Sequence, residues 1–161
     1  MSQPVIAVIG AGRLPAGDDL LAAAQAVGAG LAAAGAVVVC GGLGGIMEAA
    51  ARGAAAAGGV VVGILPGDDH SAGNRHLSVA VATGLGEARN TVVVRTADAV
   101  IAIGGEYGTL AEIGFALKIG RPVIGYRSWE LAREGRPDDG ITVVDSPQDA
   151  VARALAAAAS A

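Results

Sequence analysis

Short runs of β-branched residues alternate along this chain with longer alanine-rich stretches, and this alternation constrains the fold more than any other feature. It is typical of βαβ units, in which helices connect parallel strands. The apolar runs predict strands at residues 5–9, 37–40, 60–64, 79–82, 99–103, 122–125 and 141–144. The stretches between them predict helices at residues 18–34, 45–57, 86–96, 107–119 and 147–158.

The predicted strands are apolar on both faces, which requires helices on both sides of the sheet. A length of 161 residues favours one domain spanning residues 1–161. We therefore predict an α/β fold with a doubly wound, mainly parallel sheet of about seven strands. Residues 65–78 form one long segment without periodicity, and loops of that length are usually functional or mobile.

The composition of the chain indicates its cellular compartment and the kinds of partner it can bind. The net charge of −4 argues against a nucleic-acid surface, and no apolar run reaches the ~18 residues of a membrane span. The first residues lack the basic segment of a signal peptide, so we expect a cytoplasmic protein. Cys40 is the single cysteine and ends an apolar run, which predicts a core thiol. Abundant alanine with one lysine, Lys118, suggests a bacterial genome rich in GC.

Glycine gathers where four predicted strands pass into the following segment. These corners meet along the carboxyl edge of a parallel sheet, where ligands bind in doubly wound folds. Packing alone would not concentrate glycine on one edge, so the corners predict a binding site for a phosphorylated small molecule. The candidate residues at these corners are Gly10, Gly12, Arg13, Gly41, Gly42, Gly44, Gly45, Thr83, Gly84, Gly104, Gly105 and Gly108.

The run from Gly104 to Glu112 is the most informative of these corners. It follows a predicted strand and begins a predicted helix, whose free N–H groups and positive potential favour an anion such as phosphate. Tyr107 and Thr109 lie in the same run, and Thr109 can cap the helix or donate to a phosphate oxygen. Glu112 follows about one turn later, and we expect the helix start to keep it ionised.

Arg89 and Asn90 lie at the start of another predicted helix, where a cation opposes the helix dipole. An anionic ligand beside Arg89 would explain this placement; an ion pair with Glu87, Asp98 or Glu112 is the alternative.

Several classes of site are disfavoured. The first corner reads Gly10-Ala11-Gly12 but has Pro15 where a dinucleotide fingerprint needs glycine, and the chain has no phosphate loop with Gly-Lys-Ser/Thr. Acidic and histidine residues at positions 68–70 and 76 lack fixed metal-ligand spacing, so we predict no metal site. Ser71 and Ser78 lack the Gly-x-Ser-x-Gly setting of a serine hydrolase.

Three segments together resemble the Lonely Guy superfamily. They are Gly41-Gly42-Leu43-Gly44-Gly45-Ile46-Met47-Glu48-Ala49, Gly84-Leu85-Gly86-Glu87-Ala88-Arg89-Asn90 and Gly104-Gly105-Glu106-Tyr107-Gly108-Thr109-Leu110-Ala111-Glu112. The resemblance extends over residues 5–125. It implies a Rossmann-like fold, a homodimer or higher homo-oligomer, and a nucleoside 5′-monophosphate such as AMP bound at the glycine corners without a further cofactor.

The resemblance also implies an activity. Enzymes of this family are phosphoribohydrolases that release the free base from a nucleotide, with Arg89 and Glu112 matching their catalytic pair. A carboxylate near the sugar would stabilise the oxocarbenium-like transition state. The family has also carried the name lysine decarboxylase; that activity would need pyridoxal phosphate, and Lys118 lies at the far end of its helix.

Two departures favour a non-catalytic branch. The enzymes have proline before the Gly-Gly pair and lysine after the arginine, whereas this chain has Ile103 and Asn90. In these segments the chain is similar to proteins related to molybdenum-cofactor carriers. Hydrolysis, a carrier role and a regulatory nucleotide sensor are the three alternatives that the sequence leaves open.

Overall fold

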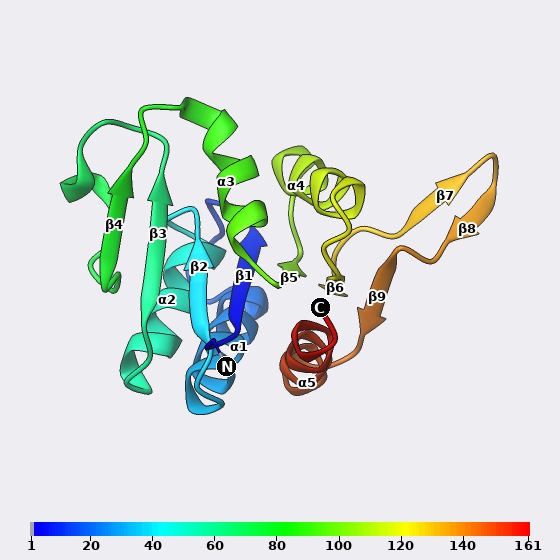
Figure 1. Cartoon of the computed structure of the whole chain (residues 1–161), viewed down its shortest axis with the longest axis horizontal. Coiled ribbons are helices and arrows are strands. Elements are labelled where there is room, and N and C mark those ends of the chain that lie inside the picture. Colours follow the sequence, from blue (N-terminus) through cyan, green and yellow to red (C-terminus); the bar gives the residue numbers. More distant parts are fainter. Residues whose placement is uncertain (1) are drawn as a thin grey trace.

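Seven parallel strands form the central sheet of the computed structural model, which describes residues 2–161 (Figure 1). The strand order is β4-β3-β2-β1-β5-β6-β9. All seven predicted strands are present, within one residue at each end. Their bounds are β1 Val5–Gly10, β2 Val37–Cys40, β3 Val61–Leu65, β4 Val79–Ala82, β5 Ala99–Ile103, β6 Val123–Tyr126 and β9 Ile141–Val144.

Five α-helices cover this sheet on its two faces, as predicted. Local signals fix their starts: the Asp18 side chain accepts from the Leu20 N–H (2.9 Å), and Ser146 caps the last helix ahead of Pro147. The predicted helix at 86–96 begins with a 3-10 turn, η2 Gly86–Ala88. The α-helices are α1 Asp19–Ala33, α2 Ile46–Ala56, α3 Arg89–Thr96, α4 Tyr107–Lys118 and α5 Pro147–Ala159.

Side chains alternate between two buried clusters, one on each face of the sheet. Ile6 and Val8 of β1 pack with α1, α2 and α5, whereas Ala7 and Ile9 pack with α3 and α4. Cys40 belongs to the first cluster, where burial raises the pKa of its thiol to about 11, so the prediction of a core thiol is confirmed.

Two connections differ from regular βαβ units. The crossover from β6 to β9 carries a hairpin that the sequence did not predict, β7 Leu131–Arg133 and β8 Arg136–Asp138, which projects from the body of the molecule (Figure 1). The predicted irregular segment 65–78 joins β3 to β4 with one 3-10 turn, η1 His70–Ala72. Asn74 anchors it by donating to the Leu43 carbonyl oxygen (3.0 Å). No helix within residues 2–161 is long and apolar enough to span a membrane.

Candidate functional site

A cleft of about 290 Å³ opens at the carboxyl edge of the sheet, between the segments that follow β1 and β5. These strands are neighbours, and the chain order runs outward from them in both directions, which makes this the topological switch point. Its size lies at the lower end of the ~300–1,000 Å³ of small-molecule sites. The cleft is lined by Gly10, Ala11, Gly12, Arg13, Met47, Arg89, Asn90, Glu106, Gly108, Thr109 and Glu112.

The first wall of the cleft is the corner after β1. The Ala11 carbonyl oxygen accepts from the Ile46 N–H (3.0 Å), which joins this corner to the start of α2. That contact brings Met47, in the first turn of α2, into the cleft lining. Arg13 is exposed, so its guanidinium is free to meet an anion at the mouth of the cleft.

The opposite wall is the first turn of α4. Gly105 has a φ of +108° and leaves room for Thr109, since a Cβ at position 105 would lie 2.5 Å from the Thr109 side chain. Thr109 is thereby buried yet lines the cleft beside Gly108. Glu106 precedes the helix without a capping bond from its side chain, so the first-turn N–H groups of α4 are available to an anion.

Arg89 lies at the base of the cleft and is only 8% exposed. Its guanidinium donates to the carbonyl oxygens of Ile64 (2.8 Å) and Gly41 (3.3 Å) and to the side-chain oxygen of Asn90. The carboxylate pairs expected as alternatives do not form: the ion pair found among the described residues joins Arg153 and Asp149. Neutral oxygens therefore hold this cation in place.

Glu112 lies in the next turn of α4 and faces the same cleft. Burial raises the pKa of its carboxyl group to about 7, although the charge of Arg89 acts in the opposite direction. Our expectation that the helix start keeps Glu112 ionised is therefore wrong for about half of these groups at neutral pH, because loss of water around the carboxylate outweighs the charge of Arg89. Desolvation likewise lowers the pKa of Arg89.

The structure brings together eight of the predicted site residues and places the others elsewhere. Gly41, Gly42, Gly44 and Gly45 form the turn before α2, where Gly41 contributes a carbonyl to Arg89 but no cleft lining. Glu48 lines a separate cavity of about 190 Å³ with Arg52. The eight residues of the cleft are Gly10, Gly12, Arg13, Arg89, Asn90, Gly108, Thr109 and Glu112.

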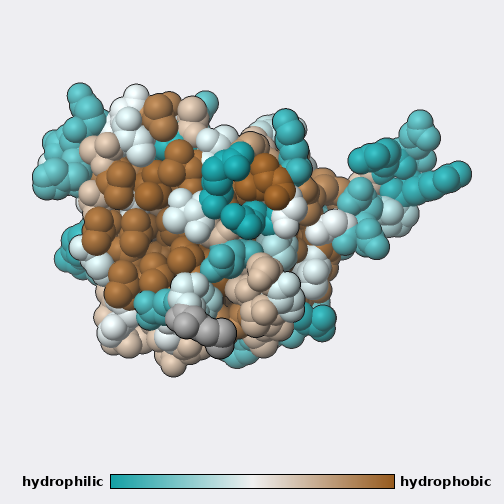
Figure 2. All heavy atoms as spheres, in the orientation of Figure 1, coloured by the Kyte–Doolittle hydropathy of each residue, from teal (hydrophilic) through white to brown (hydrophobic). Residues whose placement is uncertain are grey.

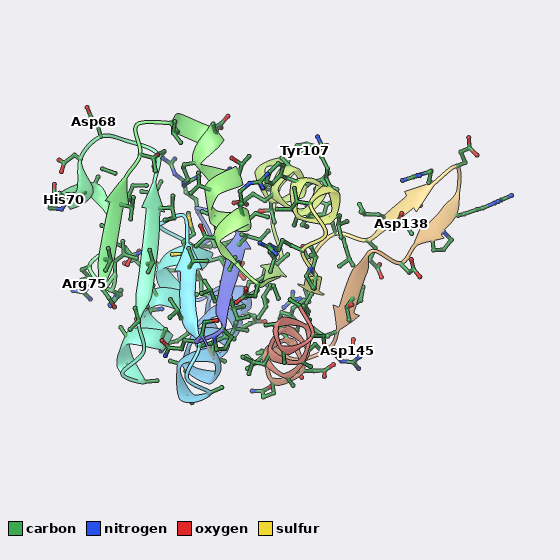
Figure 3. The ribbon with its side chains drawn as sticks, viewed as in Figure 1. Asp68, His70, Arg75, Tyr107, Asp138 and Asp145 are labelled. Atoms are coloured by element: carbon green, nitrogen blue, oxygen red, sulfur yellow. The ribbon has the colours of Figure 1, made fainter. Side chains whose placement is uncertain are left out.

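The remaining predicted residues lie outside the cleft for local reasons. The Thr83 hydroxyl donates to the Leu65 carbonyl (2.6 Å) and accepts from the Leu85 N–H (3.2 Å), which holds Thr83 and Gly84 in a turn. Tyr107 is 78% exposed on the outer side of α4 (Figure 3). Gly104 and Gly105 line a neighbouring hollow.

Segment 65–78 does not reach the cleft. Its labelled residues Asp68, His70 and Arg75 lie beside the edge strand β4, far from α4 (Figure 3). Asp69 accepts from the Ser71 N–H (2.8 Å), and hydrogen bonding by the Ser71 side chain and by this N–H lowers the pKa of its carboxyl group. Within the described part of the chain, no three His, Cys, Asp or Glu side chains are placed to hold a metal ion.

Met47, Ala11 and Glu106 line the cleft although the sequence did not single them out as site residues. The signal available for Met47 was its place two residues after the last glycine of the second corner. Its reach into the cleft depends on how α2 packs against the β1 corner, which no local pattern encodes.

A Rossmann-like sheet with a cleft at its glycine corners defines the class of this protein. Residues 3–151 match the model of the SLOG cluster4 family, and the chain belongs to that family. The match confirms the resemblance to the Lonely Guy superfamily. An uncharacterized protein from Archaeoglobus fulgidus is 38% identical over 146 residues, with 91% of each chain covered.

Solved structures agree with the carrier branch. A molybdenum cofactor binding protein from Rippkaea orientalis superposes with a TM-score of 0.85 at 32% identity, covering 97% of this chain and 98% of that one. The molybdenum cofactor carrier protein of Chlamydomonas reinhardtii gives 0.81 at 26% identity, covering 96% and 99%. DNA processing protein A from Helicobacter pylori, 17% identical, shares the fold (TM-score 0.70; 95% and 80% covered).

Proposed function

We propose that this protein binds a phosphorylated small molecule in the cleft between β1 and β5 and acts as a carrier that does not cleave it. The observation that carries the proposal is the meeting of two phosphate-type corners, Gly10–Arg13 and the first turn of α4, on one cleft at the switch point.

The phosphate would lie against the first turn of α4. Free N–H groups and the helix dipole stabilise an anion there, and Gly108 allows close approach because no other side chain fills the space around it. The Thr109 hydroxyl and the exposed Arg13 guanidinium would complete its surroundings.

The remainder of the ligand would extend towards Met47 and Asn90. Similarity to molybdenum cofactor carrier and binding proteins supports a phosphorylated pterin as the cargo. A nucleoside 5′-monophosphate carries the same phosphate chemistry and is the second ligand to test.

The state of the two predicted catalytic residues favours binding over hydrolysis. Stabilising an oxocarbenium-like sugar needs an ionised carboxylate, whereas burial raises the pKa of Glu112 to about 7 and leaves only about half of these groups ionised at neutral pH. Arg89 already donates three hydrogen bonds to protein oxygens, which suits a positioning role. Both residues nevertheless line the cleft, so phosphoribohydrolase activity is the second candidate function.

The test compares Gly108→Asp with Gly114→Asp, two changes that add the same charge on the same helix. Position 108 faces the cleft, whereas Gly114 is exposed and a Cβ there would meet no neighbouring atom within 4 Å. Calorimetric titration with AMP and with molybdenum cofactor should show that Gly108→Asp loses anion binding at least tenfold and that Gly114→Asp does not.

Chromatography of the same mixtures decides between the two functions. Stable binding with no free base or ribose 5-phosphate is the expected result. If the wild-type protein releases free base and Glu112→Gln does not, the protein is a hydrolase and not a carrier. If Gly108→Asp and Gly114→Asp bind the anion with equal affinity, the phosphate does not bind at the start of α4.

We also propose that two copies of the chain associate. The face of the sheet that carries α3 and α4 is left bare over β3 and β4, where the exposed apolar side chains are Val60, Val79 and Val81. Figure 2 shows a continuous hydrophobic patch over these strands. Parallel sheets are covered on both faces, and a second copy would supply the missing cover.

A further inference from the structure

A second depression lies beside the main cleft, beyond the corner that follows β5. Two adjoining hollows of about 240 and 350 Å³ share residues Arg127–Glu130, the segment that leaves β6. We call them together the aromatic hollow. Gly104 and Gly105 line it on one side, and Asp145, at the end of β9, on the other.

The aromatic hollow collects aromatic side chains in a chain that has only four. Tyr126 and Trp129 line it, and Tyr107 lies against Trp129 with ring centroids 5.7 Å apart. Trp129 lines both hollows, Tyr126 lines one of them and Tyr107 packs on Trp129, whereas the main cleft has no aromatic residue in its lining. Aromatic faces of this kind stack with planar heterocycles.

Specific bonds hold the hollow in shape. The Ser128 hydroxyl donates to the Gly104 carbonyl (2.6 Å), and the Trp129 indole N–H donates to the Glu106 carbonyl (3.3 Å). Arg127 lies between the end of β6 and Ser128. Its φ is +48°, a left-handed backbone conformation that costs free energy in residues other than glycine. Arg127 is exposed, so its guanidinium is available at the rim of the hollow.

The hollow and the main cleft lie on either side of one backbone ridge. Gly105 lines the hollow, and the next residue, Glu106, lines the main cleft. The start of α4, where the proposed phosphate is held, is this ridge. A phosphate bound there would have room for a substituent on each side.

The charges around the hollow exclude a second phosphate and favour a ring with N–H groups. Glu130 and Asp145 contribute carboxylates, against the single guanidinium of Arg127. Ring amino groups donate to carboxylates, whereas an anion would be repelled by them.

We infer that the ligand of this protein is of the dinucleotide type, with a heterocycle on each side of its phosphate link, and that the aromatic hollow receives the second ring against Trp129. The inference rests on the proposed function, because the α4 start must hold the phosphate link. It does not need the classical fingerprint at the β1 corner, which this chain lacks.

Trp129 is the only tryptophan, so its fluorescence reports directly on the hollow. The full chain would be titrated with ribose 5-phosphate, AMP and diadenosine pyrophosphate. We expect all three to compete for one site, and only diadenosine pyrophosphate to quench Trp129 and to bind at least tenfold more tightly than AMP.

Substitutions at Trp129 and Arg127 distinguish stacking of the second ring on Trp129 from a purely structural role of these residues. Trp129→Leu, measured by calorimetry, should bring diadenosine pyrophosphate down to the affinity of AMP, and Trp129→Phe should restore most of the difference. Arg127→Gly suits the positive φ and should keep or raise the thermal midpoint while the dinucleotide advantage falls.

The outcomes distinguish the two proposals. If AMP binds and the second adenine adds neither affinity nor quenching, the two-ring ligand is refuted and the proposed function stands. If molybdenum cofactor binds and none of the three phosphates does, the two-ring ligand is refuted and the proposed function stands. If molybdenum cofactor fails to bind as well, the proposed function fails and this inference falls with it. A dinucleotide advantage that survives in both Trp129→Leu and Arg127→Gly would place the second ring elsewhere.

Discussion

Glu112 has a pKa of about 7 in the folded chain against a reference of 4.5, and this difference links its protonation to stability. The folded state holds the proton more tightly than the unfolded state, so the stabilising contribution is complete below pH 4.5. It is lost as the pH rises through 7, by up to about 3 kcal/mol. We predict that Glu112→Gln removes this decrease in the free energy of unfolding with rising pH. Urea denaturation of both proteins between pH 4.5 and 8 measures it.

The control for this prediction is Glu87→Gln, an exposed acid in the turn that precedes α3. This variant should retain the wild-type pH profile. Equal slopes for wild type and Glu112→Gln across the range would show that Glu112 ionises in the fold as it does in water.

Arg89 supports the floor of the cleft, and its loss should lower stability as well as binding. Arg89→Ala would leave the buried carbonyl oxygens of Ile64 and Gly41 without their donor, which costs about 2–4 kcal/mol. Arg89→Lys cannot reproduce the branched set of donors and should recover only part of this loss. Chemical denaturation without ligand makes the measurement, and wild-type stability of Arg89→Ala would mean that Arg89 serves the ligand alone.

At the scale of elements, the closest helix contact joins α1 and α2 through two glycines. A Cβ at Gly28 would overlap the Ala50 carbonyl oxygen, and one at Gly53 would overlap the Gln25 carbonyl oxygen. Although alanine favours a helix by about 1 kcal/mol, we predict that Gly53→Ala destabilises the protein by about 2 kcal/mol or more because the helices must separate. Thermal unfolding measures the change.

The matched change is Gly114→Ala on α4, where a Cβ meets no atom within 4 Å. Helix propensity acts there without a steric penalty, so this variant should gain about 0.5–1 kcal/mol. A stabilised Gly53→Ala would show that α1 and α2 can move apart at little cost.

The main elements could be predicted because their signals are local. Seven apolar runs and the alanine-rich segments between them encode strands and helices directly, whereas β7 and β8 are three-residue strands that carry Arg133, Arg136 and Pro137 and show no apolar pattern. The hairpin is defined by pairing between its strands, from Leu131 with Asp138 to Arg133 with Arg136.

The candidate site was predictable to the same extent. Gly108 and Thr109 lie in the cleft because a strand and a helix start place them there, which sequence shows. Met47 enters through the packing of α2 against the β1 corner, and the protonation of Glu112 follows from its burial. Both depend on elements distant in the chain, so the motifs that contain Met47 and Glu112 do not encode them.

At the scale of the whole molecule, the two faces of the sheet are unequally covered. Three helices pack on one face and two on the other, and the bare region lies over β3 and the edge strand β4. Val79 and Val81 are 50% and 39% exposed there, and β4 carries no charge or proline to protect its edge. A second copy presents the same uncharged surface about a two-fold axis, so the net charge of −4 on each chain does not oppose pairing at this face.

We therefore predict a dimer whose mass is twice the 15.5 kDa of the chain, which light scattering after size exclusion would measure. Val79→Lys should dissociate it, because a buried unpaired ammonium group at the interface costs several kcal/mol. Val143→Lys is the control, since Val143 is 54% exposed on β9 at the opposite edge of the sheet. The proposed interface is wrong if the wild-type protein is a monomer. It is also wrong if the dimer persists in Val79→Lys but dissociates in Val143→Lys. Retention of the main-cleft ligand by the Val79→Lys monomer would further show that one chain forms the complete site.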